Sequence, residues 1–313
     1  MVQVSIITPC FNEELSIKNC IESIRVVMEE TGLSYEHIIS DNNSVDLTWQ
    51  ILKELARDDS RIKIIRNARN IGPTRNTWNA LKFAKGEAIV PFVPADLQDP
   101  PEKIPELIAK WQEGFDVVFG IRSVRKESLL MRFVRGVFYF LYNKVVDSKI
   151  PKNAGEFLIA DKSVIERALS VNGDMPYIRG LISMNAVKTA TISYVWDKRK
   201  FGKSRNNFWS LFDEAINAFT STSLKLGRLV LISGIVLSCL SCLLGLVSIV
   251  WFALSPVNTP RGIPFLITLF LIFSSYQIVL LGIVAEYTLS IKKSMIPSEA
   301  LIIAETLNFN DKV

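Results

Sequence analysis

The stretch that decides the fold is residues 88–101, Ala-Ile-Val-Pro-Phe-Val-Pro-Ala-Asp-Leu-Gln-Asp-Pro-Pro. Its apolar first half predicts a buried strand, which ends at two carboxylates and an amide before a pair of prolines. In open α/β sheets, ligands bind beyond the carboxyl ends of the strands. We therefore expect Asp96 and Gln98 to contact a ligand, because two such oxygen side chains suit a hard cation that also binds a diphosphate and water. Asp99 is expected only to cap the next helix, which the two prolines begin.

Strand-like and helix-like segments alternate along the first 120 residues. Strands are expected at residues 4–8, 36–40, 62–65, 88–93 and 117–119, with a later one at 187–196. Helices are expected at residues 15–27, 49–56, 74–85 and 104–113. Alternation of this kind predicts an α/β fold, a Rossmann-like and mostly parallel sheet with helices on both faces.

Polar residues follow four of these strands, at residues 9–14, 41–46, 69–73 and 96–98. One such group alone is weak evidence, because Asn, Asp and Gly are ordinary turn residues. Four groups at one edge of a sheet favour a nucleotide crevice. The sequence has no GxGxxG after its first strand and no GxxxxGK[ST], which disfavours a Rossmann cofactor and a P-loop nucleotide. A nucleotide diphosphate held by a metal and by side chains remains.

The C-terminal third of the chain contains two long uncharged segments. No charged residue lies between Arg228 and Arg261, and none lies between Arg261 and Glu286. Each segment exceeds the roughly 20 apolar residues that cross a bilayer, and both are longer than ordinary globular helices. We therefore expect two transmembrane helices within residues 229–291.

Basic residues flank this predicted pair at positions 225, 228, 292 and 293, whereas the connecting turn carries only Arg261. The positive-inside rule then places both termini and the N-terminal domain in the cytoplasm. The apolar opening of the chain is too short for a secretory signal and lacks a basic leader. The sequence predicts a multi-pass membrane protein.

Four parts are expected along the chain: a cytoplasmic α/β domain at 1–206, a juxtamembrane amphipathic helix at 207–228, a two-helix transmembrane domain at 229–291 and a cytoplasmic tail at 292–313. Another amphipathic helix, at residues 126–147, either packs on the sheet or lies at the membrane interface. The basic loop at residues 198–205 is either a plain juxtamembrane charge cluster or a turn that wraps an anion.

The net charge of +5 favours an anionic membrane surface and phosphate-bearing substrates over nucleic acid, because no basic stripe interleaved with aromatics is present. His37 is the only histidine, which excludes a histidine-based zinc site; we expect a structural role for it. Cys10 and Cys20 are expected to be free thiols in the cytoplasm, and Cys239 and Cys242 small packing residues in a span.

These motifs resemble those of family 2 glycosyltransferases of the GT-A fold. Residues 9–13 are similar to the P-x-Y-N-E opening of that family, 41–46 to its D-D-G-S-x-D segment, and 94–101 to D-A-D-L-Q-D-P-P. The chain departs from these segments at two places: Pro94 replaces the first Asp of D-A-D, and Asn42-Asn43 replaces D-G.

A narrower resemblance is to dolichol-phosphate mannose synthases and bacterial undecaprenyl-phosphate glycosyltransferases. It rests on residues 120–122 (G-x-R), 153–157 (D-x-G-D-F), 199–205 (R-x-x-G-x-S-K) and 285–287 (G-E-Y). Glu156 stands for the second Asp of D-x-G-D-F, and Arg205 for the Lys of the basic loop. The likeness covers essentially the whole chain.

The resemblance implies inverting transfer of a sugar from a nucleotide-diphosphate sugar, with a UDP-sugar favoured, to a membrane polyprenyl phosphate such as undecaprenyl phosphate. The product would be a lipid-linked sugar for modification of cell-envelope glycans. The enzyme would use Mg²⁺ or Mn²⁺ held by Asp96 and Gln98, with Glu156 and Asp96 as catalytic residues. It would contact membrane lipid but no nucleic acid, form a homo-oligomer and reside in a bacterial inner membrane.

The resemblance also implies two binding sets. The nucleotide-sugar set is Pro9, Phe11, Asn12, Glu13, Asp41, Asn43, Ser44, Asn70, Gly72 and Asp96. The acceptor-phosphate set is Arg122, Arg132, Arg199, Lys203 and Arg205.

Two other functions stay open from sequence. A polysaccharide-elongating family 2 transferase predicts a Q-x-x-R-W segment and more spans, and the sequence contains neither. A non-catalytic membrane protein that binds a nucleotide sugar is kept open by the departures at Pro94 and Asn42.

Overall fold

The computed structural model describes residues 2–123, 150–151, 153–170, 177–195 and 303–309, with isolated positions between 136 and 291. The chain divides into two compact units, one of residues 1–222 with 294–313 and the other of residues 223–293. The α/β fold described below belongs to the first unit.

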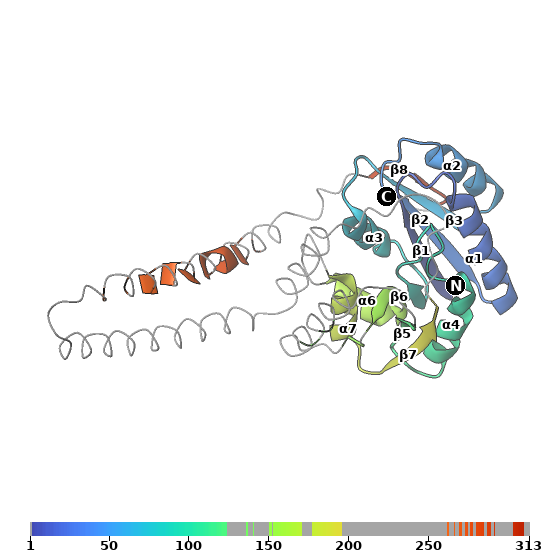
Figure 1. Cartoon of the computed structure of the whole chain (residues 1–313). Coiled ribbons are helices and arrows are strands. Elements are labelled where there is room, and N and C mark those ends of the chain that lie inside the picture. Colours follow the sequence, from blue (N-terminus) through green and yellow to red (C-terminus); the bar gives the residue numbers. More distant parts are fainter. Residues whose placement is uncertain are drawn as a thin grey trace. The chain divides into compact units, whose positions relative to one another are not determined.

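An eight-stranded sheet forms the centre of this unit, with strand order β7-β5-β6-β4-β1-β2-β3-β8 (Figure 1). The described strands are β1 (Val4–Cys10), β2 (Tyr35–Asp41), β3 (Ile62–Asn67), β4 (Ala88–Val90), β5 (Val117–Arg122), β6 (Ala154–Asp161), β7 (Thr189–Tyr194) and β8 (Ile303–Leu307). β6 is antiparallel to both β4 and β5, and β8 is antiparallel to β3, while the other neighbours pair in parallel. Four of the seven pairings between described strands are parallel and three are antiparallel, so the sheet is more mixed than expected.

Helices cover both faces of the sheet (Figure 1). The described helices are α1 (Ile17–Thr31), α2 (Thr48–Asp58), α3 (Pro73–Leu81), the 3-10 turn η1 (Pro101–Lys103), α4 (Ile104–Gln112), α6 (Lys162–Leu169) and α7 (Ile178–Met184). Residues of α1 and α4 pack with Val4 and Ile6 of β1, whereas residues of α3, α6 and α7 pack with Ile7. Because neighbouring strand residues face opposite ways, one strand supplies both cores.

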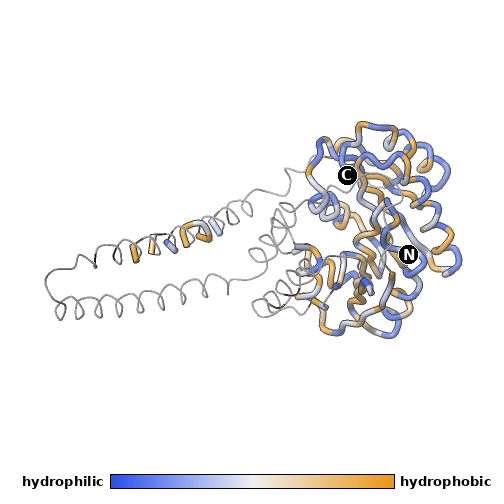
Figure 2. Tube along the Cα trace, viewed as in Figure 1, coloured by the Kyte–Doolittle hydropathy of each residue, from blue (hydrophilic) through white to orange (hydrophobic). Residues whose placement is uncertain are grey.

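The first helix shows why the sequence folds this way. Ile17, Ile21, Ile24 and Met28 recur at helical spacing and, together with Cys20 and Val27, form the buried face of the helix. Gly32 ends the helix in the left-handed conformation, at a φ of 67°, which glycine adopts without steric cost. Figure 2 shows the same division, with apolar residues along the strands and polar ones on the outer helical surfaces.

The strand predicted at residues 88–93 is shorter in the structure. β4 ends at Val90, and residues 91–93 continue beside β1 without forming a ladder. Pro91 and Pro94 have no backbone N–H to donate, so regular pairing cannot continue. One bond persists, from Val93 N to Ile7 O at 2.8 Å, and it keeps the following carboxylates next to β1.

The C-terminal tail contributes a strand that the sequence analysis did not predict. β8 pairs antiparallel with β3 and so covers that edge of the sheet. Asn308 follows it with a φ of 61°, and its side-chain amide donates to Ala56 O at 2.6 Å and Ile62 O at 2.8 Å. Phe309 then packs edge-on against Phe83 of the region after α3.

No helix in the described part of the chain is long and apolar enough to cross a membrane. The two spans predicted within residues 229–291 fall on residues that the structure describes only at isolated positions. The helix predicted at 207–228 and the basic loop at 198–205 lie outside the described residues. The helix predicted at 126–147 is described only at isolated positions. These expectations stay predictions.

Replacement of Asn308 tests how the tail is held. Asn308→Gly keeps the left-handed backbone but removes the amide, so we expect the unfolding free energy to fall by about 1–2 kcal/mol. Asn308→Ala should cost about 1 kcal/mol more, because alanine is strained at this φ. Thermal unfolding of the full-length protein in detergent should show a midpoint roughly 2–8 °C lower for the glycine variant. Equal midpoints for both variants and the wild type would contradict this account of the tail.

Candidate active site at the carboxyl edge of the sheet

The loops after β1 and β2 are joined by side-chain to backbone hydrogen bonds. Asn12 N donates to Ser44 Oγ at 2.9 Å, and Val45 N donates back to Asn12 Oδ1 at 2.9 Å. Ser44 N in turn donates to Asp41 Oδ1 at 3.0 Å. Asn12 and Asn43 adopt left-handed φ values of 56° and 62°, which asparagine tolerates better than most residues. Two predicted nucleotide-binding segments therefore form one continuous rim.

Glu13 lies between this rim and the second helix. Its backbone N donates to Thr48 Oγ1 at 2.8 Å, and its Oε2 accepts a hydrogen bond from Ser16 Oγ at 2.7 Å. Pro9 pairs with Ser40 across β1 and β2, one residue before each strand ends. Phe11 follows β1 directly. The predicted residues after the first strand are thus gathered at the edge, with Glu13 also ordering the entry to α1.

Asp41 is the buried acid of the rim. It ends β2 and is fully buried, and its Oδ2 lies 3.5 Å from Arg66 Nε of β3. Neither of these two atoms has a hydrogen-bond partner in the described part of the chain. Burial raises the pKa of Asp41, against the hydrogen bonds from Ser44 and the charge of Arg66. The Oδ2 oxygen receives no hydrogen bond from the described residues and lies at the edge where ligands bind, so a ligand could donate a hydrogen bond to it.

The loop after β3 is attached to the same rim. Asn70 Oδ1 accepts hydrogen bonds from Gly72 N and from Asn42 Nδ2, both at 2.9 Å. Gly72, at a φ of 85°, precedes the first residue of α3. Asn70 and Gly72 are therefore attached to Asn42, the residue that follows Asp41. Their role in nucleotide binding stays a prediction.

The loop after β4 carries the predicted metal ligands. Leu97 has a left-handed φ of 57°, its N donates to Pro94 O at 3.1 Å, and Gln98 N donates to Asp96 Oδ1 at 3.1 Å. Asp96 and Gln98 are half-buried. No group of three His, Cys, Asp or Glu that could hold a metal occurs among the described residues. One carboxylate and one amide fit a hard divalent cation that draws its other ligands from phosphate oxygens and water.

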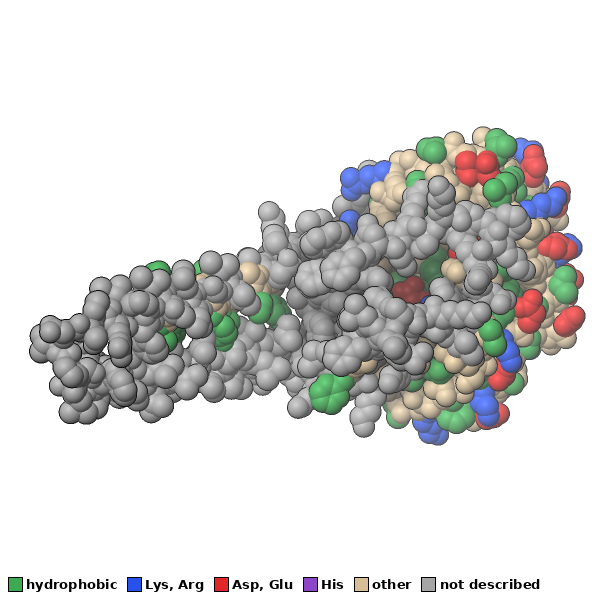
Figure 3. Space-filling view, viewed as in Figure 1, with side chains coloured by type: hydrophobic (Ala, Val, Ile, Leu, Met, Phe, Trp, Pro, Cys, Tyr) green, Lys and Arg blue, Asp and Glu red, His purple; other side chains and the backbone are tan. Residues whose placement is uncertain are grey.

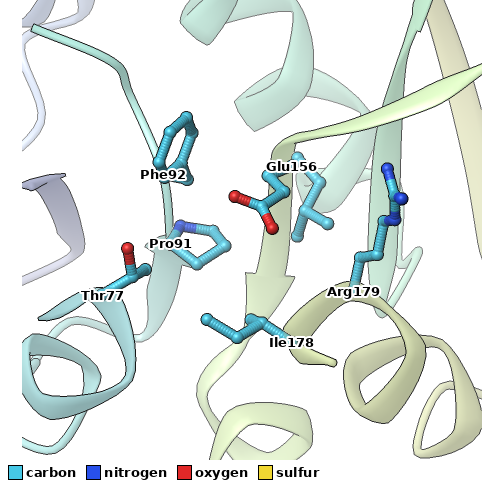
Figure 4. Close-up of a pocket in the computed structure, with 7 residues that line it drawn as sticks. Thr77, Pro91, Phe92, Glu156, Ile178 and Arg179 are labelled. Carbon is cyan, nitrogen blue, oxygen red and sulfur yellow. The ribbon is translucent and has the colours of Figure 1, made fainter. Parts of the chain in front are cut away.

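Glu156 approaches the same edge from an antiparallel strand. β6 begins beside the carboxyl end of β5, where Ile121 pairs with Ala154. In Figure 4 the Glu156 carboxylate points from β6 toward Pro91 and Phe92, and Arg179 extends from the start of α7. The small pocket around Glu156 is lined by Thr77, Pro91, Phe92, Glu156, Leu158, Ile178 and Arg179.

Arg179 is held beside this pocket by three contacts. Its Nη1 donates to Ala154 O at 3.1 Å, and its Nε donates to Tyr177 Oη at 2.6 Å. The guanidinium also lies over the Tyr177 ring, 4.9 Å from its centroid. Arg179 was not predicted as a site residue, because nothing in its local sequence links it to β6.

A triad of buried Asp99, partly buried Arg122 and buried Tyr194 ties three elements together. Arg122 Nη2 donates to the two oxygens of Asp99 at 3.0 and 3.1 Å, and Arg122 Nε donates to Tyr194 Oη at 3.1 Å. Tyr194 Oη donates to Asp99 Oδ1 at 2.5 Å. Burial alone would lower the pKa of Arg122, but the charge of Asp99 and these bonds raise it. Burial, reinforced by Asp99, raises the pKa of Tyr194.

The expected role of Asp99 as a helix cap is wrong. The residue before η1 is Pro100, which makes no side-chain cap, and the Asp99 carboxylate turns instead toward Arg122. A buried carboxylate needs a cation or several hydrogen-bond donors. The Arg122 guanidinium at the end of β5 provides both a positive charge and hydrogen bonds. Arg122 also lies over Gly155, where an added Cβ would stand 3.3 Å from the guanidinium. The triad therefore joins the Asp96 loop to the strand that carries Glu156.

The remaining predicted residues divide into two groups. Arg132, Arg199, Lys203 and Arg205 lie outside the described residues.

His37 is a buried residue of β2 whose Nε2 lies 2.8 Å from Thr8 Oγ1, and burial lowers its pKa to about 3. It is a neutral core side chain, as expected. Acidic and basic side chains are intermingled over the described part of the face in Figure 3, which shows no basic stripe there.

The triad makes a direct stability prediction. Tyr194→Phe removes a donor to Asp99 and an acceptor for Arg122, so we expect a loss of about 1–3 kcal/mol in unfolding free energy. Tyr35→Phe is the matched control, because the Tyr35 hydroxyl makes no hydrogen bond to the described residues. Denaturant unfolding of the full-length protein compares the two. If both variants unfold alike, the triad is not a stabilising unit.

Comparisons with known proteins agree with this architecture. Glycosyl transferase family 2 matches residues 5–169. The uncharacterized glycosyltransferase YkcC of Bacillus subtilis (strain 168) is 33% identical over 287 residues, which cover 91% of this chain and 88% of that protein. The prophage bactoprenol glucosyl transferase homolog of Escherichia coli (strain K12) is 31% identical over 290 residues. The match covers 91% of this chain and 93% of that protein.

A solved structure shares the fold at low identity. Glucosyl-3-phosphoglycerate synthase from Mycobacterium tuberculosis, in complex with Mn²⁺, UDP and phosphoglyceric acid, has a TM-score of 0.51 and 18% identity. The match covers 70% of this chain and 77% of that one, and it supports the fold alone. The family match over residues 5–169 and the two relatives at 33% and 31% identity show that the chain belongs to glycosyl transferase family 2.

Proposed function

We propose that this family 2 glycosyltransferase moves a sugar, with inversion, from a UDP-sugar to a membrane polyprenyl phosphate such as undecaprenyl phosphate. The observation that carries the proposal is the gathering of Asp41, Asp96 and Glu156 at one edge of the sheet. The choice of acceptor is supported by relatives that are named bactoprenol glucosyl transferase. One of them, from Shigella phage SfV, is 31% identical, and the match covers 91% of this chain.

The donor nucleotide would lie along the rim after β1, β2 and β3. Asp41 offers a buried oxygen without a donor, and Asn12 with Ser44 fixes the backbone around it. A nucleobase carries N–H groups that satisfy such an oxygen, so binding would remove an unfavourable feature of the free protein. The diphosphate would then extend toward the loop after β4.

Asp96 and Gln98 are the residues that would hold Mg²⁺ or Mn²⁺ beside the diphosphate. When bound, such a cation stabilises the negative charge of the departing nucleoside diphosphate as a Lewis acid. The structural neighbour that shares the fold was solved with Mn²⁺ and UDP, which agrees with a metal of this class. Pro94 adds no oxygen side chain, so this chain would bind the ion through fewer protein ligands than the D-A-D pattern allows.

Transfer would form a bond from an acceptor phosphate oxygen to the anomeric carbon as the bond to the donor diphosphate breaks. Attack on the face opposite the leaving group inverts that carbon. Because a phosphate is largely ionised near neutral pH, a strong general base is unnecessary, and Glu156 would orient the acceptor or take a residual proton. Arg132, Arg199, Lys203 and Arg205 are the proposed cations for the acceptor phosphate, because they offset its repulsion by the donor diphosphate. Arg122, expected from sequence to join them, already neutralises the buried carboxylate of Asp99.

The predicted membrane segments suit this acceptor. A polyprenyl chain stays in the bilayer and only its phosphate emerges, so the site must be held at the interface. We place the enzyme in a bacterial inner membrane as a homo-oligomer with two spans, with both termini in the cytoplasm. The product would be a lipid-linked sugar for modification of cell-envelope glycans.

Transfer of labelled sugar into the organic phase tests the proposal. Full-length enzyme in detergent is given undecaprenyl phosphate and, in turn, radiolabelled UDP-, GDP- and dTDP-sugars with Mn²⁺ or Mg²⁺. We expect label in the organic phase from a UDP-sugar, lost when a chelator removes the metal. A growing water-soluble polymer would favour an elongating transferase, and UDP binding without any transfer would favour a non-catalytic binding protein.

Asp96→Ala tests the metal site within this assay. The variant loses the only carboxylate of the proposed pair, so we expect transfer to fall by at least 10²-fold while the protein stays folded. Glu106→Ala is the matched control, because Glu106 is an exposed acid of α4 that pairs only with Lys103 in the described chain. Full activity of Asp96→Ala, or equal losses in both variants, would contradict the assignment.

A further inference from the structure

Asn42 joins the loop after β2 to the loop after β3. Its Oδ1 accepts from Ile71 N at 3.0 Å and from Asn67 Nδ2 at 3.3 Å, and its Nδ2 donates to Asn70 Oδ1 at 2.9 Å. Asn42 is 3% exposed, whereas Asn70 lies at the surface. One buried amide therefore acts as acceptor and donor at once, and both roles point at the Asn70–Gly72 loop.

Further neutral side chains extend this arrangement behind the site. Asn67 Nδ2 also donates to Asn76 Oδ1 at 2.7 Å, and Asn67 Oδ1 accepts from Asn79 Nδ2 at 3.2 Å. Asn76 Nδ2 donates to Ser40 O at 2.8 Å, and Ser40 Oγ donates to Asn76 Oδ1 at 2.6 Å. All but Asn70 are buried. The members of this amide network are Ser40, Asn42, Asn67, Asn70, Asn76 and Asn79.

The network explains why an amide stands at position 42, where the family pattern has a carboxylate. An ionised carboxylate there would still accept from Ile71 N, but it could not donate to Asn70 Oδ1. It would also place a second buried negative charge beside Asp41, whose only close cation is Arg66 among the described residues. A half-satisfied buried network is costly, so the amide is the residue that this arrangement requires.

We propose that Asn42 is a positioning residue that fixes the Asn70–Gly72 loop in the shape the donor nucleotide needs. The inference rests on the proposed function, because it assigns the Asn70–Gly72 loop to the donor. Asn42 itself is buried under the loop and need not touch the nucleotide. The consequence is specific. If the side chain at position 42 cannot donate a hydrogen bond to Asn70, the nucleotide should bind more weakly, while use of the acceptor phosphate should be unchanged.

Binding of UDP with Mn²⁺ to the full-length enzyme, measured by calorimetry, is the test. We expect Asn42→Asp to raise the Kd for UDP about tenfold at pH 8, because one donor is lost and one buried charge is added. Asn42→Ala, which adds no charge, should also raise the Kd and keeps the test valid if the first variant does not fold. In both variants the acceptor KM should stay within twofold of the wild type.

A pH series separates positioning from general damage. Protonation of the carboxyl introduced at position 42 restores a donor toward Asn70 Oδ1, so the ratio of variant to wild-type Kd should fall as the pH is lowered to 5.5. Taking the ratio removes the titrations that both proteins share, whereas Asp41, close to Arg66, titrates together with the carboxyl at position 42 as a coupled pair. Asn42→Ala has no such group, and its ratio should stay constant with pH.

Asn79→Ala is the control for stability, because Asn79 belongs to the network but makes no contact with the Asn70–Gly72 loop through a hydrogen bond. It should lower the unfolding midpoint and leave the Kd for UDP unchanged. The inference is overturned if Asn42→Asp and Asn42→Ala bind UDP as the wild type does, or if Asn79→Ala weakens binding equally. Failure of the wild type to bind UDP, GDP and dTDP would instead overturn the proposed function.

Discussion

Parallel pairing of β1 with β2 and β4 is the constraint on which the rest of the structure depends. Parallel neighbours end at the same edge, so the segments that follow them must meet there. Each strand is buried on both faces, which fixes its register and leaves little freedom in where its last residue lies. The site is therefore a consequence of the sheet, and its polar groups occur where the apolar strands stop.

The loops at that edge must satisfy one another's polar groups. Asn12, Ser44 and Asp41 do so between the first two loops, and Asn42 does so between the second and third. Such cross-loop bonds hold irregular backbone rigid without regular secondary structure. The exception is Asp41 Oδ2, which receives no hydrogen bond from the described residues. An oxygen left in this state at the edge of the sheet is consistent with a site where a bound ligand donates the missing hydrogen bond.

Much of this architecture follows from local sequence. Apolar runs locate six of the eight described strands within a few residues, while β6 and β8 were not predicted. The Asp96 loop follows its strand as expected. The shortened β4 follows from its prolines, whose missing N–H groups interrupt the ladder. What sequence could not supply were contacts between distant segments: Tyr194 meets Asp99 across 95 residues, and Asn308 meets Ala56 across 252. No periodicity or motif pairs such residues, because only the closed sheet brings them together.

Hydrogen exchange of the full-length enzyme, with and without UDP and Mn²⁺, tests the central claim most directly. If the donor lies at the carboxyl edge of the parallel strands, the ligand should slow exchange in the segments 11–14, 42–47, 70–72 and 96–98. Exchange in α6, which covers a face of the sheet away from these loops, should be unchanged. Saturating ligand that protects α6 and leaves those four segments untouched would contradict the account.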